Sequence, residues 1–285
     1  MALTRMDGLL REARGRKQAL PGFECWDSGS IQAIVQAAVQ TGLPVVFQAS
    51  PTEYTYCGGP DALTAMVRWY VDRHEITAAL HLDHGSTLAH VRECLEAGFT
   101  SVMLDASRHP YEENVRLTRA AVEMACDFDV SVEAELGHVG GFEGDLPELD
   151  ADETLQTDPD QAAEFVAETG TDCLAVAIGT IHGAYRGKPV INIDRLRAIA
   201  GQVSQPLVLH GGSMTPDSDI RACIREGIAK INICTELQQE WLAGLDDSRK
   251  TNTISVPGTF YAPAHDRMLN LMIAKLELFA SGNHT

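Results

Sequence analysis

The sequence predicts a single α/β domain folded as a (β/α)8 barrel, the TIM-barrel architecture, with an N-terminal helix and a C-terminal helical extension. Eight short apolar runs alternate with segments of helical periodicity along the 285 residues. The runs are almost continuously apolar, which is typical of parallel strands covered on both faces. Eight strand–helix units in about 250 residues is the length of a closed barrel. No G-x-G-x-x-G run follows the first strand, which weighs against an open doubly wound sheet.

The predicted strands are, in chain order, residues 20–25, 43–50, 77–84, 100–107, 130–137, 172–179, 205–212 and 228–235. Helical periodicity is clearest at 29–42, 87–98, 158–170 and 215–227. Ile31, Ile34 and Val35 share one face of the first of these helices, and Gly42 ends it. The last two segments begin with a capping side chain followed by proline, the favoured order at a helix start.

The two ends of the chain are also predicted to be helical. Residues 1–20 have the pattern of an amphipathic helix, and interrupting charges distinguish them from a secretory signal. No Pro/Gly/Ser-rich linker divides the chain, so we expect one domain over residues 1–285, with the C-terminal extension at about 246–285.

Composition excludes several classes of partner. The formal net charge of −18 argues against nucleic acid and anionic membrane surfaces, and an anionic substrate would need a local binding site. No apolar run approaches the roughly 18 residues that a membrane span requires. Seven cysteines without a C-x-x-C pair are typical of reduced thiols, which predicts a cytoplasmic protein.

Polar residues gather at the predicted strand ends, where barrel enzymes carry their catalytic groups. They are Ser50, Asp83, His84, Asp105, Ser107, Glu133, Glu135, His182, His210, Gly211, Gly212, Ser213, Asn232 and Thr235. Three imidazoles with an open position are the pattern of a catalytic zinc site. Asp83 is adjacent to His84, and neighbouring strand residues point to opposite faces, so joint chelation of one ion is unfavourable. Asp83 would then serve as a general acid or base.

Five motifs carry a resemblance to a known family. They are HLDHG at 81–85, VEAELGHVGG at 132–141, AVAIGTIHGAY at 175–185, LVLHGGS at 207–213 and KINICTEL at 230–237. In this order they resemble the class II, zinc-dependent aldolases, which include fructose- and tagatose-bisphosphate aldolases and ketose-1-phosphate relatives. The resemblance covers roughly residues 10–245 and every polar strand end.

The resemblance implies a metal-dependent lyase. One Zn²⁺ per subunit would be held by His84, His182 and His210, where it would chelate dihydroxyacetone phosphate and stabilise its enediolate. Asp83 matches the residue that exchanges a proton with the C4 hydroxyl. Glu143, in a glycine-rich loop suited to closing over substrate, matches the carboxylate that moves the C3 proton.

The same comparison implies how the substrate is bound. Backbone N–H groups of Gly211, Gly212 and Ser213, before a helix that starts near Pro216, would hold the phosphate. Thr235 would add a hydroxyl, Asn232 would hydrogen-bond to the enediolate, and Ser50 is included among the substrate-binding residues. A monovalent cation, Na⁺ or K⁺, is implied near Gly183 and Gly211.

Three further acids have two interpretations. Glu133 and Glu135 are two apart on one strand, so both are expected to point into the barrel mouth. Asp105 and Glu135 match an alternative metal position in the family, and either could instead orient a ligand histidine. We favour the orienting role for Glu133, Glu135 and Asp105.

The aldehyde side departs from the family pattern. Bisphosphate aldolases carry a C-terminal arginine for the distal phosphate, whereas this chain has Ala264 and His265 there, with Arg267 in a shifted register. Glu24 stands where the family usually has asparagine. A carboxylate would repel an anionic acceptor, so we expect a ketose 1-phosphate in preference to a bisphosphate.

Two other functions remain open: a metal-dependent hydrolase on the same barrel and a non-catalytic metal-binding barrel. Schiff-base chemistry at Lys230 is disfavoured because the three histidines would then lack a purpose. The expected partner is a small sugar phosphate, with no nucleic acid and no membrane. A homodimer or homotetramer is implied by the resemblance alone.

Overall fold

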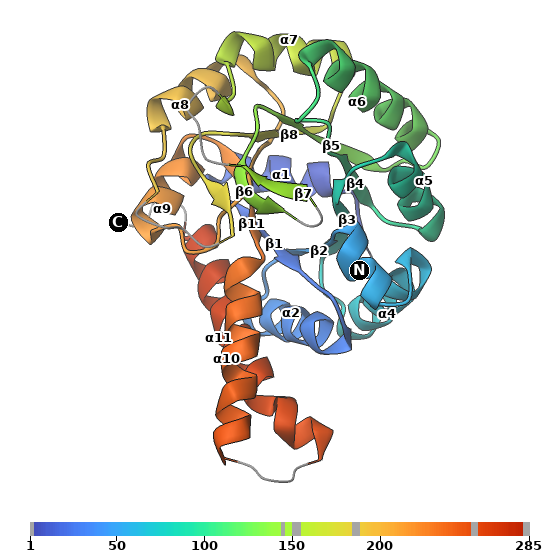
Figure 1. Ribbon diagram of the computed structural model, residues 1–285, viewed down its shortest axis with the longest axis vertical. Helices are drawn as coiled ribbons and strands as arrows, with labels where there is room; N and C mark the ends of the chain where they lie inside the picture. Colours follow the sequence, from blue (N-terminus) through green and yellow to red (C-terminus); the bar gives the residue numbers. More distant parts are fainter. Residues whose placement is uncertain (1–2, 144–145, 150–154, 184–188, 252–255, 282–285) are drawn as a thin grey trace.

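Eight parallel strands close into a barrel, as the sequence predicts (Figure 1). The computed structural model describes residues 3–143, 146–149, 155–183, 189–251 and 256–281, and for residues 142–143 and 146–149 their backbone alone. The barrel strands are β1 (Leu20–Glu24), β2 (Val45–Ala49), β3 (Ala78–Gly85), β4 (Ser101–Leu104), β5 (Ser131–Leu136), β8 (Cys173–Val176), β10 (Leu207–Leu209) and β11 (Ile228–Ile233). Their order around the barrel is β1-β11-β10-β8-β5-β4-β3-β2, with β1 paired to both β11 and β2.

The connecting helices form a ring outside the strands. They are α2 (Ser28–Thr41), α4 (Pro60–His74), α5 (Leu88–Ala97), α6 (Tyr111–Cys126), α7 (Pro159–Thr169), α8 (Ile193–Gln202) and α9 (Asp217–Arg225). Gly42 ends α2 with φ +69°, as expected, and Asp27 caps the start of the helix by accepting a hydrogen bond from the Ser30 N–H. The short α3 (Pro51–Tyr56) begins at Ser50, whose hydroxyl accepts from the Thr52 N–H at 3.2 Å.

The N-terminal helix α1 (Met6–Gly15) closes the end of the barrel where the strands begin. Its apolar face, made of Met6, Leu10 and Ala13, packs inside the barrel against inward-facing side chains of several strands. These side chains are Leu20, Val46, Ala79, Cys173, Ala175, Val208 and Ala229. This helix therefore supplies the apolar floor of a barrel whose opposite end is polar.

Inward-facing residues change in character along each strand, because alternate residues face the same side. On β3 the series is Ala79, His81 and Asp83, from the floor toward the strand end. On β2, Val46 of the floor is followed by Gln48. The strand ends thus bring polar side chains together above an apolar base, in the place that the sequence predicts.

The C-terminal helices form a projecting hairpin (Figure 1). α10 (Thr235–Thr251) and α11 (Pro257–Ala280) pack along each other and extend away from the barrel. The end of α11 returns to the barrel, where it packs against α2, α9 and β1 and buries Met272, Leu276 and Phe279. The segment predicted as an extension therefore supplies the last helix of the ring.

A second sheet lies across the barrel opening in Figure 1 and was not anticipated from the sequence. It joins β6 (Gly140–Glu143), β7 (Leu146–Leu149) and β9 (Ile181–His182) in the order β7-β6-β9. Gly140–Glu143, expected in a loop, pair in parallel with Ile181–His182. Glycines have low strand propensity, so these pairs form through contacts between distant segments rather than local preference.

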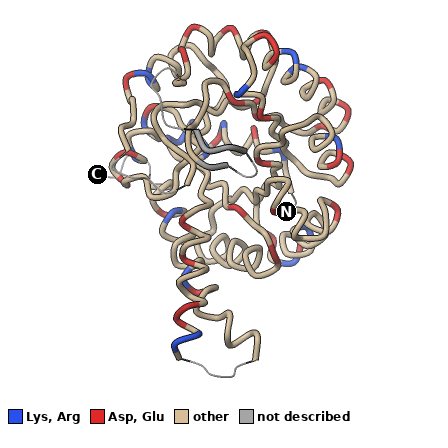
Figure 2. Tube along the Cα trace, viewed as in Figure 1, with Lys and Arg blue, Asp and Glu red and all other residues tan. Residues whose placement is uncertain are grey.

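Charged residues are spread around the outer ring of helices, with Lys and Arg interspersed among Asp and Glu (Figure 2). None of the helices that the structure describes is both long and apolar enough to cross a lipid bilayer. The acidic net charge is thus distributed over the surface.

The packing of α1 into the barrel predicts a large effect of a small truncation. Leu10→Ala should lower the free energy of unfolding by about 2–5 kcal/mol, because Leu10 is fully buried in the barrel floor. Chemical denaturation followed by circular dichroism measures this change. The control is Glu12→Ala on the exposed face of the same helix, which should have a much smaller effect. Equal effects of the two substitutions would contradict the packing role of α1.

Candidate functional site

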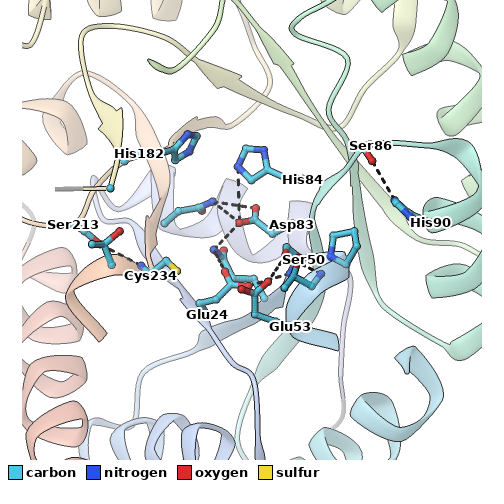
Figure 3. A pocket seen from close by; sticks show the side chains of 17 residues that line it. Glu24, Ser50, Glu53, Asp83, His84, Ser86, His90, His182, Ser213 and Cys234 are labelled. Carbon is cyan, nitrogen blue, oxygen red and sulfur yellow. Dashed lines mark hydrogen bonds and ion pairs between the residues drawn. The ribbon is translucent and has the colours of Figure 1, made fainter. Parts of the chain in front are cut away.

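A pocket opens at the C-terminal ends of the strands (Figure 3). The described residues that line it are Glu24, Gln48, Ser50, Pro51, Thr52, Glu53, Asp83, His84, Ser86, His90, His182, Gly183, Gly211, Ser213, Asn232, Cys234 and Thr235. Ten of these were predicted from the sequence as site residues. His210, Glu133 and Glu135 lie just beneath, fully buried in the barrel.

Asp83 and His84 both reach this site because of a backbone irregularity in β3. His84 has φ +47°, in the left-handed region that a residue with a side chain rarely adopts. The pairing of β3 with β4 shifts register between Leu82 and Gly85. Regular alternation would send the two side chains to opposite faces, as the sequence analysis assumed. The local distortion instead brings the imidazole to the mouth of the barrel, beside Asp83. Strained backbone of this kind is often found at functional sites.

The three predicted histidines converge. Ligand nitrogens of His84, His182 and His210 all lie within 4.8 Å of one another. Their ring centroids are 4.5 to 5.7 Å apart. Such a cluster fits a divalent cation with a preference for nitrogen ligands and an open position toward the pocket.

His210 is oriented by two buried carboxylates. Glu133 accepts a hydrogen bond from Nε2 at 2.9 Å, and Glu135 lies 3.2 Å from Nδ1. Burial and the neighbouring His84 lower the pKa of His210, but Glu133 and Glu135 outweigh both and raise it to about 9. A positive charge is therefore favoured at Nδ1. A proton and a metal cation would compete for Nδ1, because a ring nitrogen must be deprotonated to bind a metal.

Glu133 is held in turn by Lys230. The ammonium Nζ of Lys230 lies 3.0 and 3.3 Å from the two carboxylate oxygens, and both side chains are fully buried. Burial alone would raise the pKa of Glu133, but Lys230 and His81 hold it well below its usual range. An ionised Glu133 can only accept, so it fixes the proton of His210 on Nε2. Lys230 does not line the pocket.

His84 and His182 are positioned by different means. Asp105 lies 3.0 Å from His84 Nδ1 and also accepts from the Ser107 N–H, so His84 presents Nε2 to the cluster. His182 belongs to β9, and a Cβ at Gly141 would lie 2.1 Å from the His182 carbonyl oxygen. Gly141, at φ +101°, thus allows β6 to pack directly against the His182 backbone. Burial, with His84 and His210 nearby, lowers the pKa of His182 and keeps its imidazole neutral.

A second set of possible ligands shares His84. His84, Asp105 and Glu135 also place one ligand atom each within 4.8 Å of the others. Asp105 hydrogen-bonds to His84, and Glu135 lies beside His210. Both acids are therefore also placed to orient a histidine of the cluster. His81 is a core residue: its Nδ1 bonds Ser101 at 2.8 Å, and burial lowers its pKa to about 3.

Asp83 is held by two amides. Gln48 Nε2 donates to Oδ2 at 3.0 Å, and Asn232 Nδ2 donates to Oδ1 at 3.1 Å. Asp83 Oδ2 lies 4.0 Å from His84 Nε2. Burial alone would raise the pKa of Asp83, but His84 and Lys230 more than offset it and hold the pKa below its usual value. The result is an ionised, fixed carboxylate at the edge of the histidine cluster.

The side of the pocket near α10 has donor groups. Ser213 Oγ accepts from the N–H groups of Cys234 and Glu236 at 3.2 and 3.3 Å, which leaves its hydroxyl proton to donate elsewhere. Thr235 is the first residue of α10, so the positive end of that helix faces the pocket. The Gly212 N–H donates to the Asn232 carbonyl at 3.2 Å, and Gly212 is not among the lining residues.

The opposite side is rich in carboxylates. Glu24 accepts from the Ser50 N–H at 3.0 Å and from Gln48 Nε2 at 3.1 Å. Glu53 accepts a hydrogen bond from the Ser50 hydroxyl. Burial, together with Glu53 and Asp83, raises the pKa of Glu24 well above its usual value. Figure 3 places Glu24, Ser50 and Glu53 together across the pocket from His84 and His182.

Several residues that line the pocket were not predicted from the sequence, and the side chain of one predicted residue is outside the described part of the chain. Gln48, the residue before the last one of β2, was passed over as part of an apolar strand, and Glu53 and His90 reach the pocket from helices. A polar residue next to a strand end was the available signal for Gln48. Glu143 closes β6, and its side chain lies outside the described part of the chain.

Comparison with known proteins identifies related sequences and folds. A profile of the family described as fructose-bisphosphate aldolase class-II matches residues 4–284. A probable fructose-bisphosphate aldolase of Bacillus subtilis is 39% identical over 99% of both chains. The D-tagatose-1,6-bisphosphate aldolase subunit GatY of Klebsiella oxytoca is 42% identical over 81% of this chain and 80% of its own. The crystal structure of the YdjI aldolase from Escherichia coli K12 superimposes with a TM-score of 0.86 at 31% identity, covering 99% of this chain and 98% of that one.

The buried ion pair beneath the pocket predicts a stability effect. Lys230→Met should lower the free energy of unfolding by about 3–5 kcal/mol, because the Glu133 carboxylate would lose its buried cationic partner. Chemical denaturation measures it. Arg197→Met removes an exposed arginine that pairs with Asp194 and Glu226, and it should change stability little. A similar small change for Lys230→Met would refute the anchoring role of the pair.

Proposed function

Because this chain belongs to the class II fructose-bisphosphate aldolase family, we propose that it cleaves a ketose 1-phosphate or ketose 1,6-bisphosphate reversibly into dihydroxyacetone phosphate and an aldehyde. Members of this family are aldolases, a class of lyase, and depend on a metal. The observation that carries the proposal is the convergence of three histidine nitrogens within 4.8 Å, with the ionised Asp83 beside them.

The proposed metal is Zn²⁺, one per subunit, held by His84, His182 and His210. Three imidazole side chains that converge with one side toward a pocket suit zinc better than the oxygen-preferring cations. When bound, the ion supplies positive charge that polarises the substrate carbonyl and stabilises the negative charge that develops as the carbon–carbon bond breaks. Asp105, Glu133 and Glu135 orient the ligands.

Asp83 is the proposed group for proton exchange at the C4 hydroxyl. Its low pKa keeps it ionised, so in the cleavage direction it can accept the hydroxyl proton, and in the synthesis direction it returns that proton. Gln48 and Asn232 hold both carboxylate oxygens, which limits the orientations that Asp83 can adopt. Glu143 is the proposed carrier of the C3 proton.

The donor phosphate is proposed to bind between Ser213 and the start of α10. The Ser213 hydroxyl, Thr235 and the N-terminal end of α10 offer donors and a favourable dipole to a dianion in a protein of net charge −18. Gly211 and Gly183 line the same pocket, and a bound Na⁺ or K⁺ near them would offset part of the unfavourable charge. The seven free thiols accord with a cytoplasmic location, and a homodimer or homotetramer remains part of the proposal.

Chelation provides the decisive assay. The protein should release dihydroxyacetone phosphate from ketose phosphates, lose this activity when the metal is chelated, and regain it when Zn²⁺ is added.

Asp83→Ala should keep the metal and lose about 10²–10⁴ in rate, as expected for removal of a positioned acid or base. His210→Ala should lose the metal itself, measured by elemental analysis. Asp83→Asn, which keeps the size and most hydrogen bonds, tests the same role if the alanine variant folds poorly.

The control for metal content is His109→Ala, because His109 is exposed and is not among the lining residues. Hydrolysis of the ketose phosphate without release of dihydroxyacetone phosphate would indicate a hydrolase. Metal binding with no turnover would indicate a non-catalytic barrel. Either result, or full activity in Asp83→Ala, would overturn the proposal.

The phosphate site predicts a separate effect. Ser213→Ala should weaken the binding of dihydroxyacetone phosphate by about 1.5–3 kcal/mol, because one hydroxyl donor to a charged oxygen is lost. Metal content should stay unchanged. Calorimetric titration measures the affinity, and Ser218→Ala, at an exposed serine on α9, is the matched control. Equal affinities of the two variants would place the phosphate elsewhere.

A further inference from the structure

The aldehyde end of the substrate has a wall of its own in the pocket. If the donor phosphate lies at Ser213 and α10, the remaining part of the pocket is bounded by β1, β2 and α3 through Glu24, Gln48 and Glu53. Figure 3 shows Glu24 and Glu53 close together, with Ser213 in a different part of the pocket. The two ends of a ketose phosphate would therefore meet surfaces of different chemistry.

This wall consists of hydrogen-bond acceptors. Glu24 and Glu53 supply carboxylate oxygens, and Ser50 already donates its N–H to Glu24 and its hydroxyl to Glu53. Burial raises the pKa of Glu24 well above its usual value, and Glu53 and Asp83 raise it further because another negative charge beside them is unfavourable. Another anion placed here would be repelled in addition to finding few donors.

Two amide oxygens strengthen this chemistry independently of the carboxylates. Gln48 Oε1 and Asn232 Oδ1 are buried and accept no hydrogen bond within the described chain. Their orientation is set, because the amide nitrogens donate to Asp83 and a reversed amide would turn oxygen toward a carboxylate. Both oxygens converge over Gly22, where a Cβ would lie 2.0 and 3.1 Å from them. Buried acceptors without a donor are unfavourable, and a hydroxyl group that reached them would supply that donor.

The described residues of the same wall include no lysine or arginine, and neither do the other described residues that line the pocket. Arg267, the arginine nearest in sequence to the expected position, is instead paired with Asp247 at 2.8 Å and Glu240 at 2.9 Å on the α10–α11 hairpin. A phosphate on the aldehyde would have no counterion among these lining side chains.

We infer that Glu24, Gln48 and Glu53 select an uncharged, hydroxylated aldehyde, so that the substrate is a ketose 1-phosphate with a neutral polyol tail. This inference rests on the proposed aldolase function and names the acceptor that the function leaves open. Hydroxyl groups donate protons to carboxylate and amide oxygens, which a phosphate dianion cannot do.

The test compares two acceptors on the zinc-loaded enzyme with dihydroxyacetone phosphate as fixed donor. The probes are glyceraldehyde and glyceraldehyde 3-phosphate, which share the aldehyde and differ in the phosphate. We expect kcat/KM for glyceraldehyde to exceed that for glyceraldehyde 3-phosphate by about tenfold or more, because the acidic wall would repel the phosphate. Glu53→Gln should narrow this ratio, because it removes a charge while the Ser50 hydroxyl can reorient toward the amide. Glu24→Gln should change the ratio less, because the raised pKa of Glu24 favours its neutral form.

Controls separate this inference from the function it rests on. Exchange of the C3 proton of dihydroxyacetone phosphate with deuterium, followed by NMR, reports the donor half of the reaction without any aldehyde. Glu96→Gln removes the same charge from an exposed position on α5 and should leave the acceptor ratio unchanged. Exchange together with a tenfold preference for glyceraldehyde 3-phosphate, or an unchanged ratio in Glu53→Gln, would overturn the acceptor assignment alone. Absence of exchange would overturn the aldolase function, and the acceptor assignment with it.

Discussion

The carboxylate of Glu133 lies inside the barrel between the ammonium of Lys230 and the imidazole of His210, and the geometry of the pocket depends on this arrangement. A buried carboxylate without partners is strongly unfavourable, and the ammonium of Lys230 offsets part of that cost. Once ionised and fixed, Glu133 determines which nitrogen of His210 faces the other two histidines. The ion pair therefore converts an interior that would favour apolar side chains into a base for a polar site.

A second constraint is the backbone of His84. Its left-handed conformation places two consecutive residues of β3 on the same side, although a regular strand would separate them. The distortion allows one residue to serve the histidine cluster and the adjacent Asp83 to face the substrate. Asp83 stays close to the cluster without occupying it, which suits proton transfer next to a polarised carbonyl.

Two sides of the pocket differ in their electrostatic character, although the protein as a whole is strongly acidic. At the α10 side, a helix N-terminus and hydroxyl donors favour an anion despite the net charge of −18. At the β1–β2 side, Glu24 lies near Glu53 and Asp83, and a further negative charge is unfavourable there. One substrate molecule that spans both surfaces would thus be oriented by electrostatics before any specific contact with the histidines is made.

Local patterns in the sequence determined the barrel and much of the site. Apolar periodicity and helix caps specify the eight barrel strands and several of the helices between them within the chain's own neighbourhood, and eight such units leave few alternatives to closure. Closure brings all strand ends to one rim, so Asp83, His182 and His210 could be placed together from their positions alone. Only the tertiary structure decided how those side chains are used. Lys230 and Glu133 are 97 positions apart, and Gln48 joins Glu24 to Asp83 across three strands. The sheet of β6, β7 and β9 and the return of α11 to the ring likewise depend on distant pairings. Such contacts carry no local periodicity, because their energies arise only when separate segments meet.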